Sequence, residues 1–217
     1  VLEKYIQGYY YICMYYTIQD GNVTLSAMTD RDVNTQQEGK APQPNALLFP
    51  SRHLDSYMKN LHENVKEFAR SLQMQNGTMF IQAFVKGDEF IVFEMGYRLC
   101  GANEYVIVSK ENEINTLDMY IQMALTGKFQ GWDNTKYDNP YFKNKYCILI
   151  PLLKSGKIAS CSCLDTIREM PEVIHVVQFY QDGEVVPEET MGSLVQSLAR
   201  IYVYAENTEK LKQAIHK

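Results

Sequence analysis

Apolar positions near the start of the chain follow the pattern of strands. Residues 9–18, YYYICMYYTI, are dense in tyrosine and β-branched side chains, which favours a strand. The tripeptide DGN at 20–22 is a strong hairpin signal, so residues 23–28 are expected to return as the partner strand. Residues 30–51 hold Asn, Gln, Gly and Pro with few apolar side chains, and we predict an ordered surface loop there.

The apolar period then becomes helical. From Ser51 to the dipeptide NG at 76–77, apolar residues recur at helical spacing: Leu54, Met58, Leu61, Val65, Phe68 and Leu72. A second strand pair follows, MFIQAFV at 79–85 and FIVFE at 90–94, with its turn within 86–89.

The turn of this second pair decides which side chains share a face. A three-residue loop, 87–89, places Gln82 directly across from Glu94 on the same face. A two-residue turn, 87–88, moves Gln82 to the opposite face. Because both faces of the hairpin are apolar, the sequence leaves both registers open.

The rest of the chain mixes helices with short strands. Asn115 is suited to cap a helix running to about Leu125, Gly127 would end it, and residues 128–145 are predicted as an irregular connection. Further strands are expected at 147–153, 158–163, 173–180 and 194–204, and a closing helix from 207–209. Strands outnumber helices, which is typical of an α+β fold.

Composition and charge limit the classes of function. The chain has 217 residues, 46% hydrophobic and 22% charged, as expected for a globular protein with a sizeable core. The net charge of −5 argues against a nucleic-acid or acidic-membrane surface. The longest apolar run, around 146–153, is far shorter than the ~20 residues that span a bilayer. The five cysteines are scattered without zinc-ligand spacing, which indicates reduced thiols and a cytoplasmic location.

The stretch FEMGYRLCG at 93–101 carries the candidate chemistry. Glu94 closes an apolar strand and offers a hard oxygen ligand suited to Mg²⁺, and Arg98 offers a planar fork for a phosphate. Gly96 and Gly101 allow the backbone to approach a ligand closely. Such a set supports phosphoryl transfer, which depends on positioning and charge neutralisation. On spacing alone, an ion pair between Glu94 and Arg98 or their solvation at a sheet edge is the simpler interpretation.

Other candidates are weaker. The histidines share no ligand spacing: His53, His62, His175 and His216. Ser160 and Ser162 lack the Gly-x-Ser-x-Gly elbow of a nucleophile, and the glycine patterns of Rossmann and P-loop sites do not occur. The tyrosines of 9–16 are better explained as both faces of a packed strand than as a platform for stacking bases.

The order of three segments resembles the ATP-grasp superfamily. They are EKYI at 3–6, a gapped strand followed by TDRD at 29–32, and a signature formed by Gln82 and then EMGYRLCG at 94–101. The pattern is similar to that of biotin carboxylases, carbamoyl phosphate synthase large subunits and L-amino-acid ligases.

The resemblance implies roles for individual residues. Glu94 would be a magnesium ligand that bridges the terminal phosphates of ATP, and Arg98 would be the catalytic residue that holds the transferring phosphoryl group or the acyl phosphate. The first acidic ligand of the family is replaced by Gln82, whose carbonyl oxygen can coordinate the metal without bringing charge. The family's asparagine two residues after the glutamate is Gly96 in this chain.

The same resemblance implies an adenine and ribose site near the start of the chain. Lys4 and Ile6 would contact adenine through their main-chain groups, and Glu3 would sit beside it. Tyr10 or Tyr11 would lie near the ribose.

The implied fold is α+β, the C-terminal lobe of an ATP-grasp protein with an antiparallel sheet and flanking helices. This lobe would occupy residues 1–110, with its hinge at 1–8 and its signature hairpin at 79–101. A helical and irregular connection at 111–145 and a small β-rich C-terminal subdomain at 146–217 would follow.

The implied activity is that of an ATP-dependent carboxylate–amine (or bicarbonate) ligase, similar to carbamoyl phosphate synthase, in which an amine attacks an acyl phosphate. Its cofactors would be ATP and Mg²⁺, and its substrates would be a small carboxylate and an amine. The protein could form a homodimer, and we expect neither nucleic acid nor a membrane as a partner. The N-terminal domain and lid lysines of the family would precede Val1, so this chain alone is expected to be inactive. The alternative is a degenerate ATP-grasp domain that binds a nucleotide or a partner without catalysis.

Overall fold

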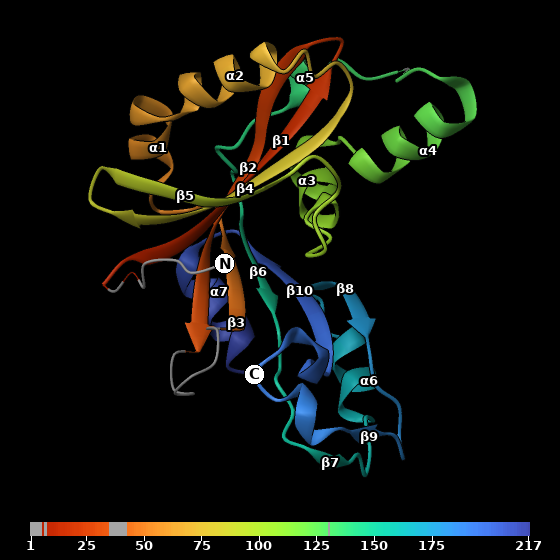
Figure 1. Cartoon of the computed structure of the whole chain (residues 1–217). Coiled ribbons are helices and arrows are strands. Elements are labelled where there is room, and N and C mark those ends of the chain that lie inside the picture. Colours follow the sequence, from red (N-terminus) through yellow and green to blue (C-terminus); the bar gives the residue numbers. More distant parts are fainter. Residues whose placement is uncertain (1–5, 7, 35–42, 130) are drawn as a thin grey trace. The chain divides into compact units, whose positions relative to one another are not determined.

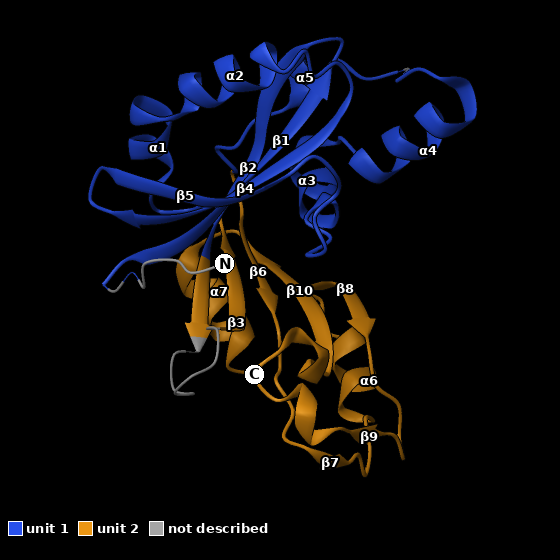
Figure 2. Cartoon of the chain, viewed as in Figure 1, with its two compact units in different colours: residues 1–30, 50–142 blue, residues 31–49, 143–217 orange. Residues whose placement is uncertain are grey.

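The chain folds into two compact units. The computed structural model describes residues 6, 8–34, 43–129 and 131–217. Unit 1 comprises 1–30 and 50–142, and unit 2 comprises 31–49 and 143–217 (Figures 1 and 2). The segment 31–49, expected in the first domain, is thus grouped with the C-terminal residues. Compactness does not measure independent folding, so the domain limits expected at 110 and 145 stay predictions.

Four neighbouring strands of unit 1 follow the order β5-β4-β1-β2. Their bounds are Tyr10–Gln19 for β1, Asn22–Asn34 for β2, Gly77–Lys86 for β4 and Glu89–Gly96 for β5. β1 pairs antiparallel with β4, and β4 pairs antiparallel with β5. β1 and β2 are also hydrogen-bonded neighbours, so the two predicted strand pairs, β1 with β2 and β4 with β5, are confirmed. Asp20 and Gly21 form the first turn with φ of 48° and 76°, the left-handed backbone that this hairpin turn requires.

One face of these strands carries the core of unit 1. Alternate side chains of β1 and β4 pack against α1 (Leu54–Asn60) and α2 (His62–Ser71), which are labelled in Figure 1. This cluster includes Ile12, Met14, Tyr16, Ile18, Ile81, Ala83, Val85, Leu54, Tyr57, Val65 and Ala69. Because successive side chains of a strand alternate between its faces, Cys13, Tyr15 and Gln82 belong to the other face.

The long helix expected after residue 51 is two helices separated at Leu61, where φ is −132°. The Tyr16 hydroxyl contacts both the Tyr57 hydroxyl, at 2.5 Å, and Nδ1 of His62, at 3.0 Å. On a regular helix, side chains five residues apart point about 140° apart. The break at Leu61 therefore lets Tyr57 and His62 reach the same buried hydroxyl.

We expect acidification to destabilise unit 1 through His62. Burial lowers the pKa of this imidazole below its usual 6.5, Lys66 lowers it further, and Glu63 opposes both. The unfolded chain then binds a proton that the folded protein excludes, so the stabilisation is complete above about pH 6.5 and is lost as the pH falls toward the folded pKa. Between about pH 8 and pH 5, the free energy of unfolding in urea should fall more steeply for the wild type than for His62→Gln. Equal slopes would contradict this prediction.

Three more helices follow β5 in unit 1. They are α3 (Tyr105–Asn112), α4 (Thr116–Thr126) and α5 (Asn134–Tyr137). The Asn115 side chain accepts hydrogen bonds from two backbone N–H groups of the first turn of α4, and Gly127 ends that helix with φ of 72°. Both predicted helix boundaries are confirmed, whereas α3 was not predicted. In the connection 128–145, the described residues form the short α5 before β6 begins at Lys145.

Asp138 joins this connection to the first hairpin. The hydroxyls of Thr24 and Ser26 donate to Oδ2 of Asp138, each at 2.7 Å, and Nδ2 of Asn112 donates to Oδ1 at 3.4 Å. Burial raises the pKa of the Asp138 carboxyl, and these donors oppose the rise. A buried carboxyl group needs such partners, because without them its desolvation is unfavourable.

Replacing Asp138 should therefore weaken unit 1. Asp138→Ala removes the common acceptor of three donors, of which Ser26 and Asn112 are buried, and we expect the free energy of unfolding to fall by about 1–3 kcal/mol. Asp165→Ala is the matched control, because Asp165 forms an exposed ion pair with Arg168 and should change stability much less. Chemical denaturation monitored by circular dichroism measures both variants. The same loss of stability in both would contradict the role given to Asp138.

Unit 2 contains four neighbouring strands in the order β3-β6-β10-β8. Its strands are β3 (Gln43–Phe49), β6 (Lys145–Leu149), β7 (Gly156–Lys157), β8 (Val173–Gln178), β9 (Val185–Val186) and β10 (Ala199–Ala205). Its helices are α6 (Cys163–Arg168), α7 (Thr208–Ile215) and the 3₁₀ helices Glu188–Thr190 and Leu194–Gln196. The core lies between the sheet and the two α-helices and includes Cys147, Leu164, Ile201, Val203 and Leu211. The predicted closing helix is α7, capped by Asn207.

Within 30–51, the prediction of a loop is wrong where the structure describes the segment. β2 continues to Asn34, and β3 pairs antiparallel with β6, with Phe49 opposite Tyr146. The apolar run at 46–49 supplies this strand. The partner strand β6 lies far along the chain, so the pairing leaves no signal in the sequence near β3. The Asn and Pro residues near β3 therefore dominated the local pattern, which looked like a loop.

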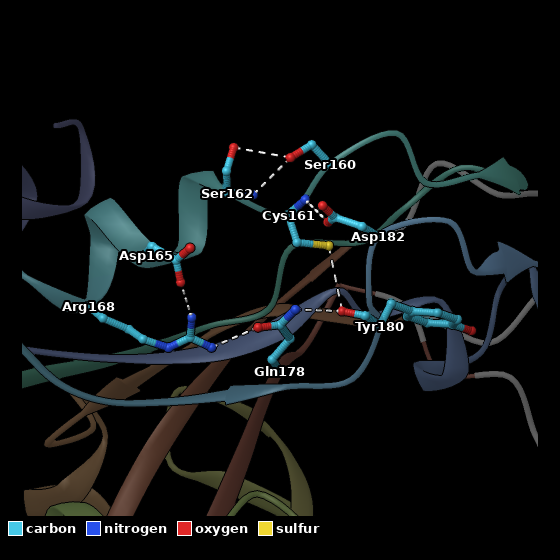
Figure 3. A network of polar contacts seen from close by, with 8 residues as sticks. All are labelled: Ser160, Cys161, Ser162, Asp165, Arg168, Gln178, Tyr180 and Asp182. Atoms are coloured by element: carbon cyan, nitrogen blue, oxygen red, sulfur yellow. Dashed lines mark hydrogen bonds and ion pairs between the residues drawn. The ribbon is translucent and has the colours of Figure 1, made fainter.

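The prediction of a strand at 158–163 is also wrong, because a polar network and α6 occupy this segment. Figure 3 shows that network. The Cys161 N–H donates to Oδ1 of Asp182 at 2.5 Å, and the Cys161 thiol points to the Tyr180 carbonyl oxygen at 3.5 Å. Arg168 joins α6 to β8 through Gln178, at 2.7 Å. The N–H and thiol of Cys161 thus contact a side chain and a backbone carbonyl of residues 180–182, and Cys161 does not pair with a strand.

Two general features complete the description. No helix among the described residues is long and apolar enough to cross a membrane. All five cysteines carry free thiols.

Candidate functional site

The hairpin β4–β5 combines a two-residue turn with a β-bulge. Lys86 pairs with Glu89, so only residues 87 and 88 form the turn. That turn alone would place Gln82 on the face opposite to Glu94. However, Ala83 pairs with Val92 and Gln82 pairs with Glu94, so Phe93 is an extra residue in β5. The bulge restores the pairing that the sequence had associated with a longer loop.

As a result, polar and aromatic side chains gather on the face that points away from the core helices. Gln82 and Glu94 are direct cross-strand partners and therefore share this face. The Phe93 ring lies 4.6 Å from the Phe84 ring, which in turn lies 4.8 Å from the Tyr11 ring. We refer to this surface, formed by Tyr11, Phe80, Gln82, Phe84 and Glu94, as the signature face.

Arg98 returns to the signature face after β5 ends. Its guanidinium carbon lies 4.8 Å from the centre of the Phe80 ring, and its Nη1 donates to the Leu99 carbonyl oxygen at 2.9 Å. Among the residues that the structure describes, Glu94 and Arg98 do not form an ion pair with each other. Both side chains are exposed on the edge strand and the turn after it, so the structure leaves both available to a ligand.

Gly96 is required at its position by space. A Cβ atom there would lie 2.3 Å from Cε1 of Phe80, far inside van der Waals contact. The Phe80 ring therefore occupies the room that a side chain at Gly96 would need.

The predicted adenine and ribose contacts are only partly described. Glu3 and Lys4 lie outside the described residues, and Ile6 is half-buried without regular structure. Tyr10 pairs with Val85 and so belongs to the core-helix face, opposite to Gln82. The Arg52 guanidinium lies 4.2 Å from the centre of the Tyr10 ring. The structure therefore does not bring Tyr10 to the signature face.

The structure favours Tyr11 over Tyr10 and adds Cys13 and Tyr15 to the same face. Tyr11, the second candidate for the ribose, lies on the signature face through its pairing with Phe84. Beside it, Cys13 pairs with Gln82 on the same face. Burial strongly raises the pKa of the Tyr15 hydroxyl, with Cys13 and Glu104 nearby. Nothing in the sequence indicated that Glu104 would lie near Tyr15, because Glu104 directly precedes α3 and that helix was not predicted.

The donor set of the signature face is compatible with Mg²⁺ that is also bound by phosphate. The carboxylate of Glu94 and the amide oxygen of Gln82 are the hard oxygen ligands that this ion prefers. Within the described residues, no cluster of three or more His, Cys, Asp or Glu side chains could hold a metal ion. A metal at Glu94 would therefore need further oxygen ligands from a nucleotide and water.

Comparison with known proteins identifies the fold. No family model matches the sequence, and no curated protein matches it. Among solved structures, L-amino acid ligase from Bacillus licheniformis matches 96% of this chain and 52% of its own, with a TM-score of 0.75 and 16% identity. Phosphoribosylglycinamide synthetase from Anaerococcus prevotii matches 98% and 52%, with a TM-score of 0.77 and 13% identity. The biotin carboxylase–β,γ-ATP complex from Campylobacter jejuni matches 96% and 44%, with a TM-score of 0.67 and 17% identity.

These three proteins are ATP-grasp enzymes, so the chain has the fold of the part of an ATP-grasp enzyme that it matches. The predicted α+β class, with an antiparallel sheet and flanking helices, is confirmed. The chain spans about half the length of the first two structures that it matches.

Proposed function

We propose that the chain is the C-terminal part of an ATP-dependent carboxylate–amine (or bicarbonate) ligase that acts through an acyl phosphate, as carbamoyl phosphate synthase does. The observation that carries this proposal is the register of β4–β5, which puts Gln82 and Glu94 on one face with Arg98 beside them. ATP-dependent activation of a carboxylate needs a metal ligand and a cation for the transferring phosphoryl group, and this face offers both.

In this proposal, each residue has a defined task. Glu94 binds the magnesium ion, and Gln82 adds an uncharged oxygen ligand. Bound Mg²⁺ would neutralise the charge of the terminal phosphates of ATP. Arg98 holds the oxygens of the transferring phosphoryl group through its planar fork of N–H donors. Of the two tyrosines considered for the ribose, Tyr11 fits this arrangement and Tyr10 does not, because Tyr11 lies on the signature face and Tyr10 on the opposite one.

A second candidate function is a degenerate ATP-grasp domain that binds a nucleotide or a partner without catalysis. It is favoured by the donor set itself, because Gln82 brings no charge and Gly96 brings no side chain. Glu94 is then the only carboxylate on the signature face as we define it. A single carboxylate could support binding of a metal–nucleotide complex without orienting it for transfer.

Magnesium-dependent ATP turnover by the full-length protein separates the two functions. For the ligase, Glu94→Ala should lower turnover by about 100-fold or more, because it removes the carboxylate that would hold the magnesium ion against the reacting phosphates. Gln82→Ala should cost roughly tenfold at limiting magnesium, in the range seen when a supporting metal contact is lost. Glu67→Ala, on the exposed side of α2, is the matched control and should match the wild type.

The assay follows ADP release with mixed small carboxylates, bicarbonate and amines as acceptors, over a titration of magnesium. If the wild type turns over ATP and neither Glu94→Ala nor Gln82→Ala changes the rate, the site assignment is wrong. If the wild type binds ATP but releases no ADP with any acceptor, the degenerate domain is the better description.

A further inference from the structure

Phe80 makes two contacts that meet at the candidate site. On one side, its ring fills the place of the missing Cβ of Gly96, its cross-strand partner. On the other side, the ring lies 4.8 Å from the guanidinium carbon of Arg98. Phe80 is itself only 2% exposed, so its ring is fixed by the packing around it. A rigid ring thus lies beneath an exposed cation.

The Arg98 side chain is held at two points. Its Nη1 donates to the Leu99 carbonyl oxygen, and its guanidinium carbon lies over the Phe80 ring. A cation over an aromatic ring is attracted by the negative charge of the ring face, and a planar guanidinium also stacks on it. Long side chains lose rotamer freedom when they bind a ligand, so a side chain that is already ordered loses less.

The close contact between Phe80 and Gly96 restricts which residue can occupy position 96. Any side chain at Gly96 would displace the ring, because its Cβ would lie 2.3 Å from Cε1 of Phe80. A glycine at position 96 therefore offers no side chain as a ligand, but it leaves the space in which the Phe80 ring lies beside Arg98. The contact between Phe80 and Gly96 thus sets the position of the ring, and the ring sets the position of the guanidinium.

We propose that Phe80 is a positioning residue that holds Arg98 in the orientation needed to bind the transferring phosphoryl group. Phe80 does not touch the nucleotide and acts only through Arg98. This proposal rests on the proposed function, because it assigns Arg98 the same task. It adds that the aromatic ring, and the glycine that makes room for it, belong to the machinery of phosphoryl transfer.

The position of Arg98 is tested first, by NMR of the arginine Nε–Hε groups in the chain of residues 1–217. The ring current of Phe80 should move the Arg98 Hε signal upfield, and Arg98→Lys identifies the signal by its loss. Phe80→Leu keeps the core apolar and should return the signal to the position of an exposed arginine. Phe80→Tyr keeps the ring and should retain the upfield shift.

Kinetics of the full-length protein test the consequence. Phe80→Leu should lower kcat for magnesium-dependent ATP turnover by roughly tenfold or more, since misplaced groups act mainly on the reacting geometry. The KM for ATP should change little, because the ring does not contact the nucleotide. Phe80→Tyr should restore most of the rate. Thermal unfolding of both variants shows whether the fold is retained.

A size exchange separates packing from positioning. Gly96→Ala alone should lower the melting temperature through overpacking against the ring, and Phe80→Leu with Gly96→Ala should recover stability because the smaller side chain leaves room. The double variant should nevertheless keep the low kcat, since it has no ring under Arg98. Recovery of both stability and kcat would show that Phe80 acts only as packing and would overturn the proposal.

Failure of this inference differs from failure of the proposed function. An Arg98 signal that Phe80→Leu does not move, or an unchanged kcat in that variant, overturns the role of Phe80 while the ligase activity stands. Absence of any ATP turnover by the wild type overturns the proposed function, and with it the task that Phe80 serves.

Discussion

A single extra residue in β5 is the constraint on which the candidate site depends. The two-residue turn of the hairpin sets a ladder in which Gln82 would face Phe93. The bulge at Phe93 shifts that ladder by one position, so the polar partners Gln82 and Glu94 meet on the face away from the core helices. The same shift sets Gly96 opposite Phe80 and brings the following turn, with Arg98, back over that ring. The positions of Glu94 beside Gln82, of Gly96 beside Phe80 and of Arg98 over the Phe80 ring are therefore consequences of one local irregularity.

Local signals in the sequence were sufficient for some elements and not for others. The turn at Asp20 and the caps of α4 and α7 are set by neighbouring residues, and these were predictable. β3 depends on pairing with β6, about 100 residues further on, and the two helices that meet at Leu61 both contact the Tyr16 hydroxyl, which lies in β1. Such contacts override local composition, which is why the loop and the single helix were wrong.

The site was predictable in its charges and not in its geometry. Glu94 and Arg98 stand out because opposite charges at the end of an apolar strand need an explanation. The choice between Tyr10 and Tyr11 depends on which residue of β1 faces Gln82, and the sequence does not contain that register. Phe80 gave no signal either, since a phenylalanine in an apolar strand is expected in any core. Its relation to Gly96 becomes visible only when a Cβ is placed on the glycine.

The charge balance of the signature face connects these observations to function. One carboxylate, one neutral amide and one guanidinium leave the site without the excess negative charge that would hold a divalent cation by itself. In the proposed function, the phosphates of a nucleotide would supply this charge and would also neutralise Arg98. Metal and nucleotide would then bind as one complex, each completing the ligand set of the other. A glycine at position 96, which offers no ligand, fits this arrangement, because the Phe80 ring occupies that space and lies beside the guanidinium that the phosphates would meet.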